Sequence, residues 1–325
     1  MKKLCLSLII ALVAMATAKA QQIAVVSENG ETTMYQTLAN AVSGASSGST
    51  IYLPGGGFNI GGLAINKKVT IIGVGHKPNS KNPDGNTTLS GNLFFMSGSQ
   101  GCALMGCYVA GTVYVGYSAS ATTSTTNNIL IRYCNVGGVR VSSLCHGIIF
   151  NQNYIRGTAD CNYTDVTFTN NVMHSIFCLK GGIVSNNVIL GSYNSYPLNN
   201  VDNTTIANNV IGYCDKDRGP GGSTNCAISG NMYQGDFGDD CIDMSDVKWE
   251  DVFEDYNDGK ISPSSNFHFT EKYQEYENEC GIYAGSTKFK DDGMAPVPYI
   301  VAKSIPEQTD ATGKLTIKVR VKAGE

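Results

Sequence analysis

The chain repeats one short pattern, in which alternating apolar residues lead into a pair of amides and apolar residues then resume. In VTFTNNVMHSIFCLKGGIVSNNVILGS, residues 166–192, the pattern occurs twice, around Asn170-Asn171 and around Asn186-Asn187. Apolar residues at every second position are typical of a half-buried strand. No ten-residue helical stretch separates the repeats. The pattern therefore predicts short strands that bend at polar turns.

When the repeats are aligned on the second amide, six positions follow one another at intervals of 18, 18, 16, 22 and 22 residues: Asn135, Asn153, Asn171, Asn187, Asn209 and Asn231. Self-similarity at this period indicates a solenoid, and its short strands favour a parallel β-helix. Equivalent residues of successive coils then lie about 4.8 Å apart. Because Asn tolerates the left-handed backbone of a tight turn and stacked amides can bond to one another, we expect these six side chains to form a hydrogen-bonded ladder.

The segment 35–75 predicts the start of the solenoid. It holds a short amphipathic helix with Leu38 and Val42 on one face, then a Gly/Ser turn, TIYLPGG and INKKVTIIG. With the asparagine repeat, this start resembles the right-handed parallel β-helix of the pectate lyase-like superfamily over residues 35–245. The resemblance implies that the helix caps the open end of the coils. It is specific for the fold and unspecific for the activity.

We therefore expect an all-β, single-stranded right-handed parallel β-helix with an N-terminal helical cap, an irregular C-terminal cover and a terminal strand. The expected boundaries are a signal peptide at 1–20, the capped β-helix at 21–245, a cover over the far end of the solenoid at 246–300, and a connector with the terminal strand at 301–325. The strand is predicted by the alternation of Leu315, Ile317, Val319 and Val321.

The N-terminus has the features of a secretory signal: two lysines, an apolar stretch over residues 4–14, and Ala18-Lys19-Ala20 before the expected cleavage point. The apolar stretch is too short to span a bilayer. Cys5 lies too early in the chain to become a lipid anchor after cleavage. We therefore expect an exported protein that is not a lipoprotein, in the periplasm, outside the cell or at its surface.

The charge and the cysteine content limit which binding partners and which cysteine chemistry are expected. The full chain has 23 Lys and Arg against 27 Asp and Glu. Cleavage would remove three lysines and leave 20 basic residues, a formal net charge of −7, which disfavours a nucleic-acid partner. Eleven cysteines less Cys5 leave ten, with no CxxC pair and no zinc signature. We expect stacked, buried thiols that act as small hydrophobic residues; the sequence leaves any disulfide pairing and the oligomeric state open.

Two long repeats, after Asn187 and after Asn209, carry about four extra residues each. Stacking is expected to place their polar residues on one flank with Arg156 and His174 of the preceding coils. Tyrosine faces suit sugar rings, and Asp and Arg suit hydroxyls or carboxylates. The resemblance implies a sugar-binding groove parallel to the coil axis, and the alternative is a solvated loop surface. The candidate binding residues are Tyr193, Tyr196, Asp215, Asp217 and Arg218.

Two low-specificity catalytic hypotheses are also open. Gly238-Asp239-Asp240-Cys241 resembles a stretch of polygalacturonases, where clustered aspartates protonate the glycosidic oxygen and activate water. The other motifs of those enzymes are missing, so Asp239 and Asp240 can equally close turns or hold a cation. A lyase needs an Arg or Lys base, usually with Ca²⁺ on the substrate carboxylate. Arg156 with His174 could serve, although the pectate lyase arginine signature is absent.

The leading hypothesis is a non-catalytic module, exported and in contact with a polysaccharide. The alternatives are a polysaccharide lyase or glycoside hydrolase with an atypical site, and a scaffold or adhesin without affinity for sugars. No cofactor and no metal are expected, except Ca²⁺ for the lyase alternative.

Overall fold

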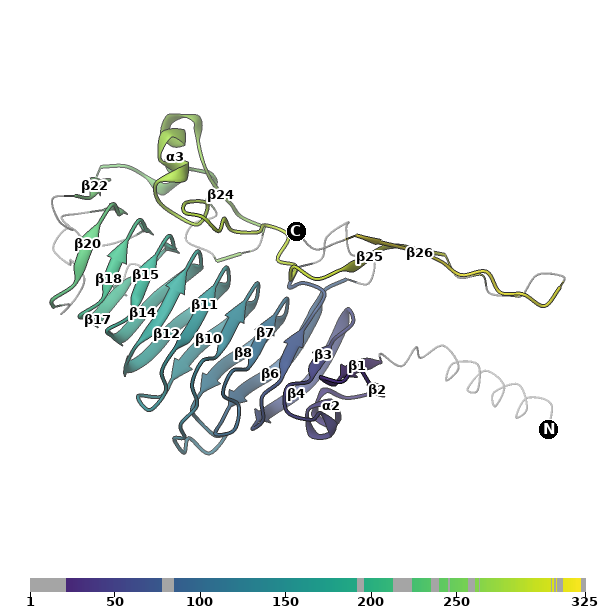
Figure 1. Ribbon diagram of the computed structural model, residues 1–325. Coiled ribbons are helices and arrows are strands. Elements are labelled where there is room, and N and C mark those ends of the chain that lie inside the picture. Colours follow the sequence, from purple (N-terminus) through teal and green to yellow (C-terminus); the bar gives the residue numbers. More distant parts are fainter. Residues whose placement is uncertain are drawn as a thin grey trace, which may run out of the picture.

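A computed structural model describes residues 22–77, 85–191, 196–212, 224–234, 240–244, 246–256, 261–262, 264–304, 306, 308 and 312–322; for 299–303 it describes the backbone alone. The expected signal peptide lies outside these residues. The chain is almost entirely β-structure, arranged as a row of stacked coils (Figure 1).

The first of two long sheets takes one short strand from each coil. Its order is β2-β1-β3-β5-β7-β9-β11-β13-β15-β18-β20, antiparallel among β2, β1 and β3 and parallel from β3 onward. The strands are β1 (Ile23–Val26), β2 (Thr32–Tyr35), β3 (Thr50–Tyr52), β5 (Thr70–Ile72), β7 (Ala103–Met105), β9 (Leu130–Arg132), β11 (Ile148–Asn151), β13 (Val166–Thr169), β15 (Ile183–Ser185), β18 (Thr205–Ala207) and β20 (Ala227–Ser229).

The second sheet is parallel throughout, in the order β22-β21-β19-β16-β14-β12-β10-β8-β6-β4, with β17 also paired to β14. Its strands are β4 (Gly56–Ile65), β6 (Thr87–Phe95), β8 (Tyr108–Val115), β10 (Asn135–Val141), β12 (Tyr154–Thr164), β14 (Val172–Lys180), β16 (Val188–Ile189), β17 (Leu198–Asp202), β19 (Val210–Ile211), β21 (Met232–Tyr233) and β22 (Ile242–Asp243). The longer strands shift register midway, for example between Val136 and Val139, so the two halves of such a strand form two segments of one coil.

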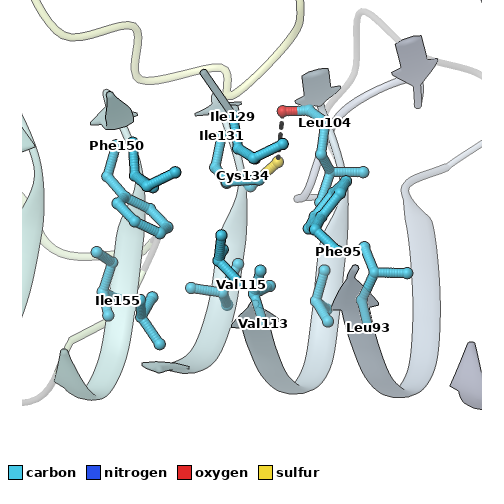
Figure 2. Close-up of a cluster of buried hydrophobic side chains, with 14 of the residues drawn as sticks. Leu93, Phe95, Leu104, Val113, Val115, Ile129, Ile131, Cys134, Phe150 and Ile155 are labelled. Atoms are coloured by element: carbon cyan, nitrogen blue, oxygen red, sulfur yellow. Dashed lines mark hydrogen bonds between the residues drawn. The ribbon is translucent and has the colours of Figure 1, made fainter. Parts of the chain in front are cut away.

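The core runs along the interior of the stack. Alternate residues of each strand point inward and meet their equivalents on the neighbouring coils, as Leu104, Ile131 and Phe150 do. All three are fully buried, and the rings of Phe150 and Phe168 stack at 5.3 Å. Figure 2 shows Leu104, Ile131 and Phe150 in a row on one side of the interior, with Leu93, Val113 and Ile155 on the opposite side. Parallel sheets of successive coils around a common core are consistent with a β-helix solenoid.

The two amides of each pair have different tasks. The first residue of the pair has a left-handed backbone, with φ of 53° at Asn170 and 56° at Asn186 and Asn208. Such angles are strained for most residues but tolerated by Asn. The second amide turns inward and is fully buried at Asn171, Asn187 and Asn209.

The inward amides form a continuous column. The Oδ1 atom of Asn171 accepts hydrogen bonds from the backbone N–H of Asn153 at 2.9 Å and from its Nδ2 at 3.0 Å. The same double contact joins Asn171 to Asn187, Asn187 to Asn209, and Asn209 to Asn231. Each Nδ2 also donates to a backbone carbonyl of the preceding coil, as Asn171 Nδ2 does to Phe150 O at 2.9 Å. Every ladder amide therefore satisfies backbone groups that the turn leaves unpaired.

Asn135 does not belong to this column, which corrects the sequence alignment. It pairs with Tyr154, one position beyond Asn153. The ladder position on its coil is Cys134, whose N–H donates to Asn153 Oδ1 at 2.9 Å. Cys107 precedes Tyr108, the partner of Asn135 on the coil before, and at the other end Asn231 Nδ2 lies 3.9 Å from Cys241 Sγ. The amide column thus ends in thiols on both sides.

The described cysteines carry no disulfide. Six of these nine are buried: Cys102, Cys107, Cys134, Cys145, Cys161 and Cys280. Burial raises the pKa of the Cys134 thiol to about 12, so this side chain stays protonated. These six thiols pack as small hydrophobic residues, which matches the expectation from their spacing.

A short helix, α2 (Leu38–Gly44), lies at the N-terminal end of the stack (Figure 1). Thr37 caps it by accepting a hydrogen bond from the N–H of Asn40. Its buried residues are Leu38, Ala41 and Val42, which join the core of the first coils.

The C-terminal region differs from the expected end cover. It contains α3 (Trp249–Val252), β23 (Phe253–Asp255), β24 (Asn266–Phe269) and the 3₁₀ helix η1 (Glu271–Asn278). These elements pack on the outer face of the second sheet, over Tyr154, Val172, Val188, Val210 and Met232. These elements therefore cover one side of the coils, where the outward-facing residues of the second sheet are apolar.

Residues 280–297, which we call the strap, then run back along the coils toward the N-terminal end (Figure 1). Gly281 N–H donates to Asn208 O, Asn170 Nδ2 donates to Ile282 O at 2.9 Å and Ala284 O at 3.1 Å, and Lys290 N–H donates to Gln152 Oε1. The strap reaches Gly75, where Met294 lies in contact distance.

Two strands follow the strap, β25 (Tyr299–Ser304) and β26 (Lys318–Lys322), which pair antiparallel. Leu315, Ile317, Val319 and Val321, whose alternation predicts a strand, are all exposed, and the last two lie in β26. Among the described residues, the structure contains no helix with the length and apolar character needed to cross a membrane.

Candidate functional site

A row of outward-facing side chains crosses the second sheet where its strands pass through their second half. The register places these residues on successive coils, and we call them the sheet row: Phe94, Tyr114, Arg140, Asp160, Phe177 and Asn199. On its coil each lies next to inward residues, as Arg140 does between the buried Val139 and Val141. The same alternation that builds the core therefore displays this row.

At the start of the sheet row, the half-buried Tyr114 packs against two buried rings, Phe94 and Tyr117, which are 5% and 7% exposed. The rings of Phe94 and Tyr114 are stacked at 4.7 Å with an interplanar angle of 11°. Tyr117, which follows β8, meets Tyr114 edge to face at 6.3 Å. Asn162 Nδ2 donates to the Tyr117 hydroxyl at 3.2 Å and holds that ring from two coils away. The rings are thereby fixed before any ligand arrives.

An ion pair continues the row. Arg140 Nε lies 3.5 Å from Asp160 Oδ2, and the two side chains are 52% and 40% exposed. The guanidinium also lies over the Tyr117 ring, 5.2 Å from its centroid. Such an exposed pair contributes little to stability. It does offer N–H donors and carboxylate acceptors beside the rings. Tyr163, which directly follows Asn162, is 52% exposed.

The predicted pair, Arg156 and His174, bonds to different groups in the structure. Arg156 extends across two coils, where Nη1 donates to Tyr108 Oη at 2.6 Å and Nη2 donates to Val109 O at 2.9 Å. His174 Nδ1 lies 3.1 Å from Ser175 Oγ on its own strand, and burial lowers its pKa. The two side chains therefore serve different neighbours.

The other predicted residues are scattered or undescribed. Asp239, Tyr193, Asp215, Asp217 and Arg218 lie outside the described residues. Tyr196 is half-buried just before β17, and Asp240 is exposed at the last coil, where its carbonyl accepts from Gly230 N–H. In the part of the chain that the structure describes, no group of three or more His, Cys, Asp or Glu side chains is arranged to hold a metal ion.

The asparagine repeat does not predict the sheet row, because the row lies away from the turn that the asparagines mark. The row lies six or seven positions after the ladder position, at Tyr114, Arg140 and Asp160 in VYV, VRV and ADC. Each of these residues is flanked by inward-facing residues. The only sequence signal for the row is therefore one large or charged residue in the middle of a three-residue segment.

Comparison of this chain with protein families, with curated proteins and with solved structures yields no match.

Proposed function

We propose that the protein is an exported right-handed parallel β-helix protein of the pectate lyase-like superfamily. The mature protein holds a polysaccharide along the sheet row and does not cleave it. The observation that carries this proposal is Tyr114, fixed against two buried rings, followed on the next two coils of the same sheet by the exposed Arg140–Asp160 pair. Successive coils lie about 4.8 Å apart, which is comparable to the length of one pyranose unit in a chain.

The chemistry of the row supports sugar binding. Aromatic faces pack against the C–H faces of sugar rings, which suits Tyr114, while the buried Tyr117 supports its ring. Ionised side chains make the stronger hydrogen bonds to hydroxyl groups, which suits Arg140 and Asp160. Because the rings and the ion pair already hold one another, little side-chain freedom is lost on binding.

The arrangement favours binding over catalysis. Glycoside hydrolysis uses two carboxyl groups on either side of the scissile bond, and the described row contributes one, Asp160, which Arg140 neutralises. Lyase chemistry needs a basic side chain directed at the substrate, whereas the Arg156 guanidinium donates to Tyr108 and to backbone carbonyls. These contacts support the non-catalytic hypothesis over the lyase and hydrolase alternatives.

A polysaccharide panel tests this proposal. Purified full-chain protein is titrated with neutral and acidic polysaccharides by calorimetry, and the mixtures are assayed for unsaturated products and for new reducing ends. We expect saturable binding of at least one polymer without product. Tyr114→Ala should weaken that binding about tenfold, because a lost ring contact is worth about 1.4 kcal/mol.

Tyr52→Ala is the matched control. Tyr52 is an exposed tyrosine, 42% exposed, on β3 of the first sheet and away from the sheet row, so its loss should leave the affinity unchanged. If polysaccharide binding persists in both Tyr114→Ala and Arg140→Ala, the sheet row is not the binding site. Product release that depends on Arg156 or Asp240 restores an enzymatic function.

A further inference from the structure

A cavity of about 640 Å³ lies on a different face from the sheet row, where the C-terminal cover stops. The outer positions in the first half of the second sheet form one continuous series across the coils. From Tyr154 to Met232 this series is apolar and is covered by the C-terminal elements. Its earlier members, Thr88, Tyr108 and Asn135, are polar and line the cavity. The outer series therefore changes from polar to apolar residues at the edge of the cavity.

The cavity draws its walls from three distant parts of the chain. His76 and Lys77 follow β5, the polar series belongs to β6, β8 and β10, and Ser262 and Ser264 come from the C-terminal cover. Asn86 completes the lining, and its Nδ2 donates to Thr88 Oγ1 at 3.0 Å. Amide and hydroxyl groups, which both donate and accept hydrogen bonds, therefore dominate the polar lining.

Tyr108 is positioned for a ligand by Arg156. The guanidinium donates to the phenol oxygen at 2.6 Å and lies over the ring, 4.5 Å from its centroid. Since the oxygen already accepts from Arg156, the hydroxyl hydrogen remains available to donate. Arg156 therefore positions Tyr108, a role that differs from the predicted catalytic one.

Two lining side chains carry polar atoms with unmet hydrogen-bonding capacity. Among the described residues, Asn135 Oδ1 and both ring nitrogens of His76 are buried without a hydrogen-bond partner. The two residues are 1% and 2% exposed. An unpaired buried polar atom is costly, and most such atoms in folded proteins are paired. Apolar side chains of similar size would fill these positions at lower cost, so their polarity points to a ligand.

The charges around the cavity disfavour an ionic ligand. Burial lowers the pKa of Lys77, while Asp291 and Asp292 of the strap oppose that shift, so the ammonium already faces carboxylates. His76 is neutral, because burial and the nearby Lys77 lower its pKa to about 3. The Arg156 guanidinium is engaged with Tyr108 and the carbonyls of Val109 and Ala110.

We propose that this cavity is a second binding site, which takes one uncharged sugar residue through hydroxyl and amide contacts from Thr88, Tyr108, Asn135 and the two serines. The site is separate from the sheet row and does not depend on it. An acidic sugar is disfavoured, because a carboxylate entering the cavity would find the nearby cations already engaged.

Titration with single sugars tests this proposal on the full-chain protein. The probes are D-glucose, D-galactose, D-xylose, L-fucose and N-acetyl-D-glucosamine, with D-glucuronate and D-galacturonate as acidic counterparts, followed by saturation-transfer NMR and calorimetry. We expect one-to-one binding of at least one neutral sugar, and weaker binding of its acidic counterpart. Tyr108→Phe and Asn135→Leu should each weaken the binding at least about fivefold, the effect of one lost hydrogen bond.

Tyr114→Phe makes the same chemical change in the sheet row and should leave this binding intact. If Tyr108→Phe disturbs folding, Ser262→Ala with Ser264→Ala removes two hydroxyls from the C-terminal wall and serves in its place. The proposal is overturned if no neutral sugar in the panel binds, if the acidic sugars bind more tightly, or if the binding is indifferent to the cavity variants. Loss of polysaccharide binding in Tyr114→Ala with monosaccharide binding retained separates the two sites.

Discussion

Each amide of the ladder serves several backbone groups at once, and this distinguishes Asn171 from Asn135. The Asn171 side chain accepts from Asn153 and donates to Phe150 O and to Asn187 Oδ1. The Asn135 oxygen has no partner among the described residues. Both are buried asparagines that precede a valine, so their sequence context is the same.

Replacing these two residues by leucine should therefore have opposite effects. Asn171→Leu leaves the N–H of Asn153 and the carbonyl of Phe150 buried without partners, and should lower the free energy of unfolding by about 3 kcal/mol. Asn135→Leu removes an unpaired oxygen and should be neutral or stabilising, as expected for a position kept for binding. Urea denaturation of both variants measures the difference. Equal losses would contradict the assignment of Asn135 outside the ladder.

His76 should make the fold sensitive to acid. Its pKa falls from 6.5 to about 3 in the folded state, through burial first and the charge of Lys77 second. Between these values the unfolded chain binds a proton that the folded chain does not. The stabilisation is therefore complete above about pH 6.5 and is lost as the pH falls, by up to about 1.4 kcal/mol per pH unit.

The His76→Phe variant tests this contribution. The free energy of unfolding, measured by urea denaturation at several pH values from 7 down to about 4, should fall less steeply for the variant than for the wild type. The groups near His76 are Lys77, the Tyr154 ring at 5.4 Å and the strap at Gly293, and all remain in the variant. Identical slopes would show that His76 is not the titrating group.

At the scale of elements, the turn pattern predicted the coils because each turn needs one left-handed residue and one inward amide. Asn-Asn pairs supply both on three coils, and Gln152-Asn153 and Gly230-Asn231 do so on two others, so five ladder positions were correct. The coil at Tyr133-Cys134-Asn135 replaces them with a left-handed Tyr133 and a ladder thiol, so alignment on the asparagine shifted it by one residue. A thiol in place of an amide leaves no signal in the spacing.

The strap was beyond prediction for a different reason. Residues 280–297 have no repeat and no regular secondary structure, and their place is set by contacts with coils more than 70 residues away. Asn170 Nδ2, for example, bonds to carbonyls 112 and 114 positions later. The sheet row was missed because a charged or aromatic residue within an apolar strand is also what a solvated surface shows.

The strap should loosen when Asn170 loses its side chain. Asn170→Gly keeps the left-handed backbone that the turn needs and removes both hydrogen bonds to the strap. We expect faster amide hydrogen exchange across 280–297, with little change in the coils. Asn128→Gly is the control, since its φ of 58° is also left-handed and its side chain is exposed. Unchanged exchange in Asn170→Gly would show that packing alone holds the strap.

At the scale of the whole molecule, one stack of coils presents two chemically different faces. On one face the half-buried Tyr114 and the exposed Arg140–Asp160 pair suit an extended polymer. On the other, the cover and strap bury the apolar part of an outer row and leave a cavity over its polar part. The cover therefore does more than protect an edge, because its serines complete the second site.

The most direct test of the central claim is native affinity electrophoresis through gels that contain the polysaccharide selected by the panel, with wild type, Tyr114→Ala and Tyr108→Phe run side by side. If the sheet row binds the polymer, the gel retards wild type and Tyr108→Phe alike, while Tyr114→Ala migrates as it does in a gel without polysaccharide. Equal retardation of all three proteins would contradict the claim.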